Sequence, residues 1–290
     1  MKKLLVLIAL TLFTITILNA QDTKDTSYWK KGGVGSLMFT QLSLTNWAAG
    51  GQNSVSLNTF VNLFANYKKN KTTWDNSFDV AYGVIKNTGT KIRKSDDRIE
   101  FNSKYGQYAF KHWYYAGLVN FKTQMAPGYN YPNDSMRISG LMAPAYASVA
   151  IGMDFKPSPK FTLFLSPVTG KMTFVLDDSL SALGAFGVEA GKTFRGEFGG
   201  YLKSVFKTDI GKNISFQTKL DLFSNYLHNP QNVDVNWEVL VAMKFSKYIT
   251  ANINTLLIYD DDIMITDKEG KTGPRTQFKE IFGLGLSYKF

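Results

Sequence analysis

The chain has no cysteine among its 290 residues and only two histidines. Without cysteine there is no disulfide framework, no thiolate metal site and no residue for lipid attachment after export. The two histidines, His112 and His228, leave little material for histidine-based catalysis or zinc binding. The sequence also contains no dinucleotide-binding fingerprint and no phosphate-binding P-loop. These absences argue against an enzyme.

Long apolar runs are also missing once the first residues are set aside. Residues 1–20 combine two early lysines with an apolar stretch and end in Leu-Asn-Ala, which predicts a cleaved export signal. A disordered N-terminal segment is expected over 21–27. The longest uncharged apolar stretch after it, residues 141–153, is shorter than the roughly 20 residues of a spanning helix and contains Pro144. A membrane location therefore requires a closed barrel, because lipid offers no partner to unpaired backbone groups.

What the chain does contain is strict two-residue alternation, most clearly at its C-terminus. Apolar side chains occupy every second position there, with small or polar residues between them, and the apolar set is Phe282, Leu284, Leu286, Tyr288 and Phe290. An alternating last strand with an aromatic end is typical of outer-membrane β-barrels. We interpret these residues as the C-terminal signal that closes the barrel. Segments 54–67, 214–226 and 233–245 alternate in the same way.

About twelve segments of strand length predict an all-β fold, namely a transmembrane antiparallel β-barrel over residues 28–290. Short connections are expected at 68–72, 110–112, 156–160, 211–213 and 246–248, and long ones at 87–96, 128–139, 167–192, 227–232 and 261–276, with a brief first connection at 47–52. Short periplasmic turns and long extracellular loops are the rule in such barrels, so both termini should be periplasmic. Lysine marks every short connection, and Asp177 is expected to cap a short helix in the longest loop.

Charged residues at inward positions form the candidate site in the lumen. They are Asp79, Arg98, Glu100, Lys104, Lys122, Lys219, Asp221, Asp234, Glu238 and Lys244. Charge is tolerated there only in a wet interior or in mutual pairs, and both signs are present. The leading hypothesis is therefore a narrow, porin-like channel, or a structural or accessory subunit of an envelope complex, without catalytic residues.

The outer loops supply a weaker metal hypothesis. Asp260, Asp261 and Asp262 end a strand, and their mutual repulsion would be relieved by a divalent cation such as calcium. A calcium loop, however, spaces its ligands at alternate positions with a glycine. We expect no other cofactor.

The same loops supply the alternative function. His228 with Ser224 or Ser179 would form the base and nucleophile of an outer-membrane enzyme that modifies lipid or lipopolysaccharide. A soluble periplasmic β-sandwich is a third interpretation. The expected partners are outer-membrane lipids and lipopolysaccharide, the barrel-assembly machinery during biogenesis and an envelope-complex protein. Nucleic acid is not expected despite the formal charge of +10, because the chain is exported.

Several short motifs resemble those of a known family. They are Asn46-Trp47 leading to Gly50-Gly51, Trp74-Asp75-Asn76 with Ala81-Tyr82-Gly83, Lys94-Ser95-Asp96-Asp97, Asn120-Phe121-Lys122-Thr123-Gln124, Ala143-Pro144-Ala145-Tyr146, Ser166-Pro167, Asn225-Tyr226, Tyr259-Asp260-Asp261-Asp262 and Gln277-Phe278-Lys279-Glu280. In these motifs the chain is similar to a family of Gram-negative outer-membrane proteins catalogued as domain of unknown function 3078. The resemblance implies a barrel over nearly the whole mature chain. It brings no reaction, ligand or catalytic residue.

Overall fold

The computed structural model describes residues 27–43, 52–131, 133–266 and 269–290. The predicted signal peptide, the predicted disordered segment except Ser27, and most of the predicted first connection lie outside these residues. Twelve long strands form the main sheet: β1 (Trp29–Leu42), β2 (Ser54–Lys69), β3 (Thr72–Asn87), β4 (Arg93–Phe110), β5 (Trp113–Thr123), β8 (Ala145–Ser158), β9 (Phe161–Phe174), β10 (Phe194–Ile210), β11 (Ile214–Asn225), β12 (Val233–Lys244), β13 (Ile249–Tyr259) and β16 (Gln277–Lys289).

These strands close into one antiparallel barrel. The hydrogen-bonded order is β1-β16-β13-β12-β11-β10-β9-β8-β5-β4-β3-β2, and β2 returns to β1. At the closing seam, Leu37 of β1 faces Leu286 of β16. The Gly33 N–H donates to the Phe290 carbonyl at 2.9 Å, and the Phe290 N–H donates back to the Gly33 carbonyl at 3.1 Å. No edge of the barrel sheet is left open, which confirms the predicted fold class.

The two ends of the barrel are built differently. Short turns join the strands at one end, over residues 70–71, 111–112, 159–160, 211–213 and 245–248. The other end carries the hairpins β6 (Gly128–Tyr129) with β7 (Arg137–Ser139) and β14 (Met264–Thr266) with β15 (Thr272–Pro274), helix α2 (Asp178–Ala182) and the 3₁₀ turn η2 (Ala185–Gly187). This arrangement confirms the predicted short periplasmic turns and long extracellular loops. No helix among the described residues is long and apolar enough to cross a membrane.

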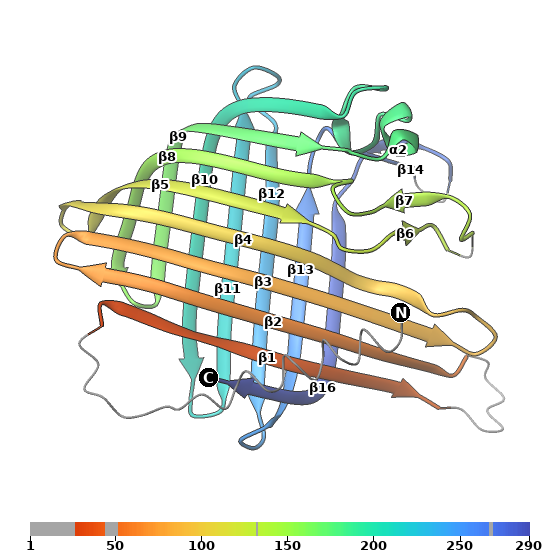
Figure 1. The fold of residues 1–290 in the computed structure, drawn as a ribbon, viewed down its shortest axis with the longest axis horizontal. Helices are drawn as coiled ribbons and strands as arrows, with labels where there is room; N and C mark the ends of the chain where they lie inside the picture. The colour runs from red at the N-terminus through yellow and green to blue at the C-terminus, as the bar shows by residue number, and fades with distance from the viewer. Residues whose placement is uncertain (1–26, 44–51, 132, 267–268) are drawn as a thin grey trace.

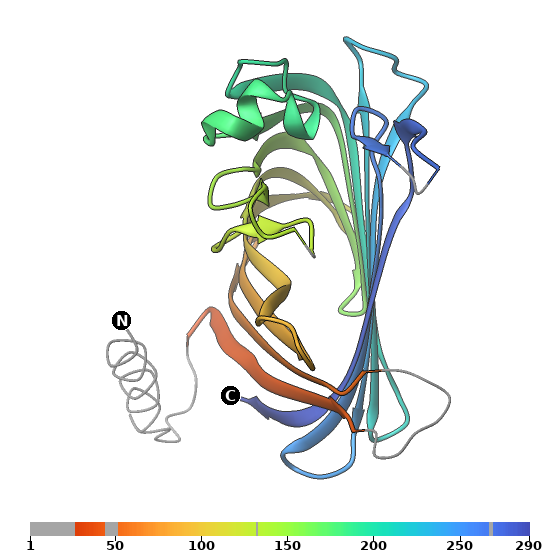
Figure 2. The same cartoon turned by 90° about the vertical axis from the view of Figure 1, so that its right-hand side faces the viewer.

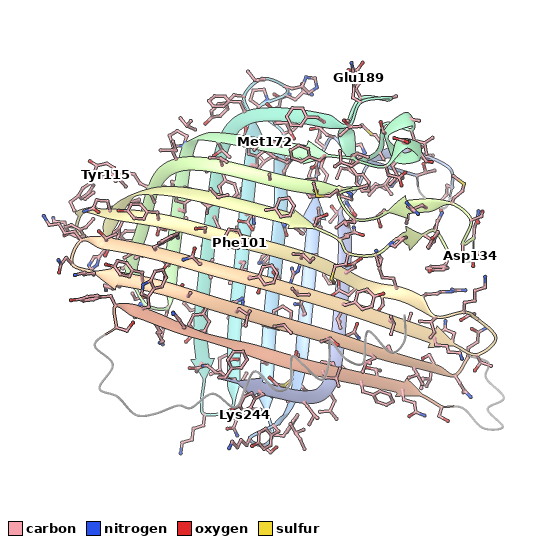
Figure 3. All side chains as sticks on the ribbon, in the orientation of Figure 1. Phe101, Tyr115, Asp134, Met172, Glu189 and Lys244 are labelled. Atoms are coloured by element: carbon pink, nitrogen blue, oxygen red, sulfur yellow. The ribbon has the colours of Figure 1, made fainter. Side chains whose placement is uncertain are left out.

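The wall itself has two chemically different faces. Large apolar side chains stand exposed on the outside, such as Leu57 at 39%, Phe101 at 39% and Ile151 at 65% exposure. Inward-pointing neighbours include Asp79 and Asp154, which are 3% and 0% exposed. Figure 2 shows the two curved walls that enclose this interior, and Figure 3 shows side chains on both of their faces. Such an apolar exterior around a charged interior is stable when the exterior faces hydrocarbon.

Strand β9 corrects the predicted connection at 167–192. The strand continues through Pro167 to Phe174, although a proline cannot donate a backbone hydrogen bond. The pairing of β9 with both neighbours shifts at this point. The Ser166 hydroxyl fills the gap and lies 2.8 Å from the carbonyl oxygens of Ile151 and Val168. This local bulge keeps the backbone satisfied, so the loop begins only after Phe174.

Strand β4 corrects a second connection. It begins at Arg93, so most of the predicted 87–96 loop is strand and only residues 88–92 connect β3 to β4. Asp96, the last residue of the predicted connection, and its neighbour Asp97 both lie inside β4. Both are held by cations, since Lys279 lies 2.7 Å from Asp96 and Lys94 lies 2.9 Å from Asp97. These ion pairs are what let the strand extend further than its charged sequence indicates.

Candidate functional site

The middle of the lumen is spanned by ion pairs between opposite walls. Strands β4 and β12 lie on opposite sides of the twelve-strand ring, and so do β3 and β11. The Arg98 guanidinium of β4 reaches the Glu238 carboxylate of β12 with two contacts of 3.4 and 3.5 Å. Lys219 of β11 lies 4.0 Å from Asp79 of β3 and 3.8 Å from Glu238. Side chains therefore bridge the full width of the barrel at this level.

Asparagine amides hold the central carboxylates in place. The Asn254 amide donates to Glu238 at 3.2 Å, and the Asn120 amide donates to Glu100 at 3.1 Å. Asn102 also donates to Glu100, at 3.0 Å. Each amide sits at an inward position of its strand, next to the carboxylate strand or on it. Because a partly satisfied buried network is costly, these amides stabilise the charged groups beside them.

A second group of pairs lies nearer the periplasmic end. Lys104 of β4 lies 2.7 Å from Asp154 of β8. Lys156, two residues further along β8, lies 2.6 Å from Asp75 of β3 and 3.2 Å from Asp154. These pairs tie three strands together across the interior, because β8 and β3 are not neighbours in the sheet.

Other luminal charges pair between neighbouring strands. Lys203 and Asp221 face each other from neighbouring strands at 2.8 Å, and the Tyr201 hydroxyl donates to the same carboxylate. We call the whole set the mid-lumen cluster: Arg98, Lys104, Lys122, Lys156, Lys203 and Lys219 with Asp75, Asp79, Glu100, Asp154, Asp221 and Glu238. Six cations face six carboxylates, so the cluster is formally neutral.

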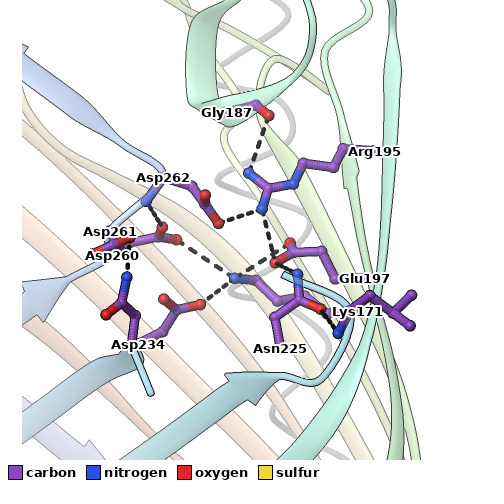
Figure 4. A network of polar contacts seen from close by, with 11 residues as sticks. Lys171, Gly187, Arg195, Glu197, Asn225, Asp234, Asp260, Asp261 and Asp262 are labelled. Carbon is purple, nitrogen blue, oxygen red and sulfur yellow. Dashed lines mark hydrogen bonds and ion pairs between the residues drawn. The ribbon is translucent and has the colours of Figure 1, made fainter. Parts of the chain in front are cut away.

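The extracellular end of the lumen is acidic (Figure 4). Lys171 of β9 lies 2.6 Å from Asp234, 3.5 Å from Glu197 and 3.5 Å from Asp260. One basic side chain thus contacts three carboxylates, each from a different strand or strand end. We call this group, together with the Arg195 contacts described next, the vestibule cluster.

Arg195 is the second cation of the vestibule cluster. Its guanidinium pairs with Asp262 and with Glu197 at 3.1 Å, and it donates to the Gly187 carbonyl at 3.1 Å. Asp261 accepts a hydrogen bond from the Asn232 amide at 2.5 Å. The cluster therefore contains Glu197, Asp234, Asp260, Asp261 and Asp262 against Lys171 and Arg195. Five carboxylates with two cations leave a formal surplus of three negative charges.

Each carboxylate of the acidic triplet is thus paired with another side chain of this chain. Asp260, Asp261 and Asp262 contact Lys171, Asn232 and Arg195 respectively. Within the described ranges, no group of three or more histidine, aspartate or glutamate side chains is arranged to hold a metal ion. The divalent-cation hypothesis stays a prediction.

Most of the predicted lumen residues lie on the inner face and come together there. Lys122 stands opposite Glu100 in the β4–β5 pairing. Lys244 differs, because it lies at the turn end of β12, exposed, with its backbone N–H bonded to the Asn213 carbonyl at 2.7 Å. An inward position at the last residue of a strand opens to solvent, so Lys244 does not join either cluster.

Sequence reasoning missed several members of the network, and Lys171 shows why. Before the β9 bulge, even-numbered residues such as Phe164 and Ser166 point inward, whereas after it Thr169, Lys171 and Thr173 do. A simple two-residue alternation therefore loses its phase at Pro167. The proline is the sequence signal that could have predicted this change, because a proline within a strand often marks a bulge.

The predicted hydrolase pair is not assembled in the described part of the chain. The Ser224 hydroxyl donates to the Pro230 carbonyl at 2.6 Å. His228 lines a small hollow at the mouth with Glu197, Asp234 and Asp262, and no hydrogen bond joins it to a serine among the described residues. A nucleophilic serine needs such a contact with its base, allowing for looser geometry without substrate.

Part of the chain matches the model of a known family. The model of the family "Protein of unknown function (DUF3078)" matches residues 39–129, which confirms the predicted resemblance over that part of the chain. No curated protein matches the sequence.

Solved structures to which the chain is similar include three outer-membrane proteins. The translocator domain of the autotransporter NalP from Neisseria meningitidis has 8% identity and a TM-score of 0.38, covering 100% of this chain and 98% of that one. The COG4313 outer membrane channel from Pseudomonas putida F1 has 12% identity and a TM-score of 0.40, with coverages of 93% and 100%. Outer membrane phospholipase A from Escherichia coli, an active-site mutant, has 10% identity and a TM-score of 0.37, with coverages of 94% and 96%.

The location of the protein follows from its own wall. A closed antiparallel barrel with an apolar outer surface, a charged lumen, short turns at one end and long loops at the other is the form of bacterial outer-membrane proteins. The protein is an outer-membrane β-barrel, and outer-membrane lipid surrounds its wall.

Proposed function

We propose that this outer-membrane β-barrel protein is a narrow channel for small cations, held closed by paired charges that span its lumen. The observation that carries the proposal is the bridging of opposite walls by Arg98 with Glu238 and by Lys219 with Asp79. These contacts are long for ion pairs, at 3.4 and 4.0 Å, so they are weaker than an ideal bidentate pair. Weak pairs across a lumen can separate when an ion passes.

The cost of luminal charge supports a transport role over a purely structural one. Replacing a buried ion pair with well-packed apolar residues is often neutral or stabilising, so rigidity alone does not require the twelve charges of the mid-lumen cluster. Lys219 also lies within 4.0 Å of two carboxylates, Asp79 and Glu238. A cation that can exchange partners opens a path without leaving any charge unpaired.

The vestibule cluster supports cation preference. Its surplus of three negative charges lies in the extracellular mouth, where low-dielectric walls concentrate the field. Rings of carboxylates are also how cation channels select their ions. We therefore expect cations to be enriched at the entrance and anions to be excluded.

Planar-bilayer recordings of the refolded protein test this proposal. Wild-type protein should show small, infrequent openings with a cation-selective reversal potential across a potassium chloride gradient. Arg98→Gln removes the bridge to Glu238 and should raise the open probability several-fold. The matched control is Lys91→Gln, which breaks the exposed loop pair of Lys91 and Asp134 at 2.7 Å and should leave the recordings unchanged.

The same recordings distinguish the channel from a structural or accessory role. If wild-type protein and Arg98→Gln are both electrically silent while folded, the channel proposal fails. A structural or accessory role in an envelope complex then remains. Folding is checked separately, because closed barrels migrate faster on a gel until they are boiled.

A further inference from the structure

The periplasmic end of the barrel is strongly and almost exclusively basic. Ten exposed lysines lie in or beside the short turns, and we call them the lysine ring: Lys30, Lys31, Lys68, Lys69, Lys71, Lys111, Lys160, Lys212, Lys247 and Lys289. Among the described residues at this end, the carboxylates that reach solvent are Asp209, the C-terminal carboxylate and Asp75, and Asp75 pairs with Lys156. None of the ten lysines forms an ion pair within the described ranges, although ion pairs occur throughout the lumen.

The extracellular loops behave differently. Two of their exposed cations face carboxylates, Lys91 with Asp134 at 2.7 Å and Arg137 with Asp177 at 2.8 Å. Lys86 and Lys192 are exposed at this end without an ion pair in the described part of the chain. Lysine therefore does not simply keep every connection soluble. Within the described ranges, unpaired exposed lysines are more numerous at the periplasmic end than at the extracellular end.

The lysine ring surrounds the whole barrel. Its members come from the start of β1, from all five short turns or the strand ends beside them, and from the end of β16. A docking surface for one protein would be expected on one side of the barrel. A ring on every side matches a partner that also surrounds the barrel, and in an outer membrane that partner is the lipid of the periplasmic leaflet.

Aromatic side chains place the ring at the level of the lipid headgroups. The Lys69 ammonium lies 4.4 Å from the centre of the Tyr28 ring, and the Lys247 ammonium lies 5.2 Å from that of Tyr248. Trp29 packs between Tyr67 and Trp74, with ring centres 5.2 and 5.7 Å away. Tryptophan and tyrosine occupy the membrane interface in outer-membrane barrels, so Lys69 and Lys247 lie at the level of the phosphates of the adjoining lipids.

We propose that the lysine ring binds anionic phospholipid headgroups of the periplasmic leaflet and gathers a shell of these lipids around the barrel. The recognised group is the phosphodiester with net negative charge, as in phosphatidylglycerol. Each lysine near a charged membrane surface contributes a small attraction that salt screens, and ten act together. This inference is independent of whether the lumen conducts.

Tryptophan quenching by brominated lipids tests it, because Trp29, Trp74 and Trp113 all lie at this end of the barrel. The protein is reconstituted into phosphatidylcholine vesicles in which either a quarter of the lipid is brominated phosphatidylglycerol or the same fraction is brominated phosphatidylcholine. We expect the apparent binding constant for the anionic lipid to be about three- to tenfold higher in low salt and to approach that of phosphatidylcholine in 1 M salt, where screening is nearly complete.

Two variants assign the effect to the ring. Replacing Lys68, Lys69, Lys71 and Lys111 together by Gln should remove most of the preference. Replacing the extracellular Lys86, Lys91 and Lys192 by Gln is the matched control and should retain it. Both variants leave the luminal charges intact, and heat-modifiable migration shows whether each has folded. Equal quenching by the two lipids in low salt, or a preference that survives in the ring variant, overturns the proposal.

Discussion

A charged side chain inside this barrel is positioned by a partner from another strand. Glu238 illustrates this, since it is approached by Arg98 from the opposite wall, by Lys219 from the next strand and by the Asn254 amide. Removing one partner of a buried pair costs about 3–5 kcal/mol in a dry core. The remaining two partners of Glu238 should keep the loss in Arg98→Gln below that range.

His228 provides a prediction at the same scale. Its ring makes no hydrogen bond to a serine among the described residues, and Ser224 donates to the Pro230 carbonyl instead. We expect His228→Ala to leave the lipid A and phospholipid composition of the producing cells unchanged, as measured by mass spectrometry of extracted lipids. If the variant instead lacks one lipid species that acyl transfer or hydrolysis would produce, the lipid-modifying alternative is supported.

At the scale of elements, helix α2 depends on one carboxylate. The Asp177 side chain accepts hydrogen bonds from the backbone N–H groups of Ser179 and Leu180, both at 3.1 Å, which confirms the predicted cap. Asp177 also pairs with Arg137 of β7 at 2.8 Å and so joins two loops. The Leu180 hydrogen bond, followed by the Arg137 guanidinium, lowers the pKa of the Asp177 carboxyl below its usual value.

Because of this lowered pKa, the stability of helix α2 should depend on pH. A carboxyl whose folded pKa lies below its unfolded value of about 4 stabilises the fold fully above that pH, and the contribution is lost as pH falls through the folded pKa. Hydrogen exchange at Leu180, corrected for intrinsic rates, should therefore accelerate in acid. Asp177→Ala should lose about 1 kcal/mol of helix stability at pH 7 and show no such acid step. Asp177→Asn should keep most of the cap but also lack the step.

Strand β9 shows how a single element sets the site. Its bulge at Pro167 rotates the second half of the strand, which brings Lys171 into the vestibule cluster. A straight strand with unbroken alternation would have turned this lysine toward lipid. The Ser166 hydroxyl stabilises the bulge because it donates to the Ile151 carbonyl, next to the proline, which has no N–H to donate.

At the scale of the whole molecule, stability depends on the seam between β1 and β16. A Cβ added at Gly285 would overlap the Leu37 carbonyl oxygen, whereas a Cβ at Gly35 on the same seam meets open space. Gly285→Ala should therefore destabilise the barrel by about 1–3 kcal/mol through overpacking, and Gly35→Ala should not. The measurement is the temperature at which the fast-migrating folded band disappears. Equal temperatures for the two variants would contradict this account of the seam.

The sequence determined the class, the faces and the order of this barrel. Alternation assigned Asp79, Glu100 and Glu238 to the interior, because the side-chain period of a strand is two residues whatever lies across from it. The lengths of the connections fixed which end is periplasmic, and the aromatic last strand predicted closure. All of this information is local to each segment.

Only the tertiary structure decided which charges meet. Arg98 and Glu238 are 140 residues apart in the chain, and alternation states that both point inward without stating their height or their partner. The height and the partner of each side chain depend on how each strand is staggered against the next. This stagger accumulates over the six strands that separate opposite walls of the ring. The bulge in β9 adds a change of phase. The pairing across the lumen is therefore a property of the closed barrel and of no single segment.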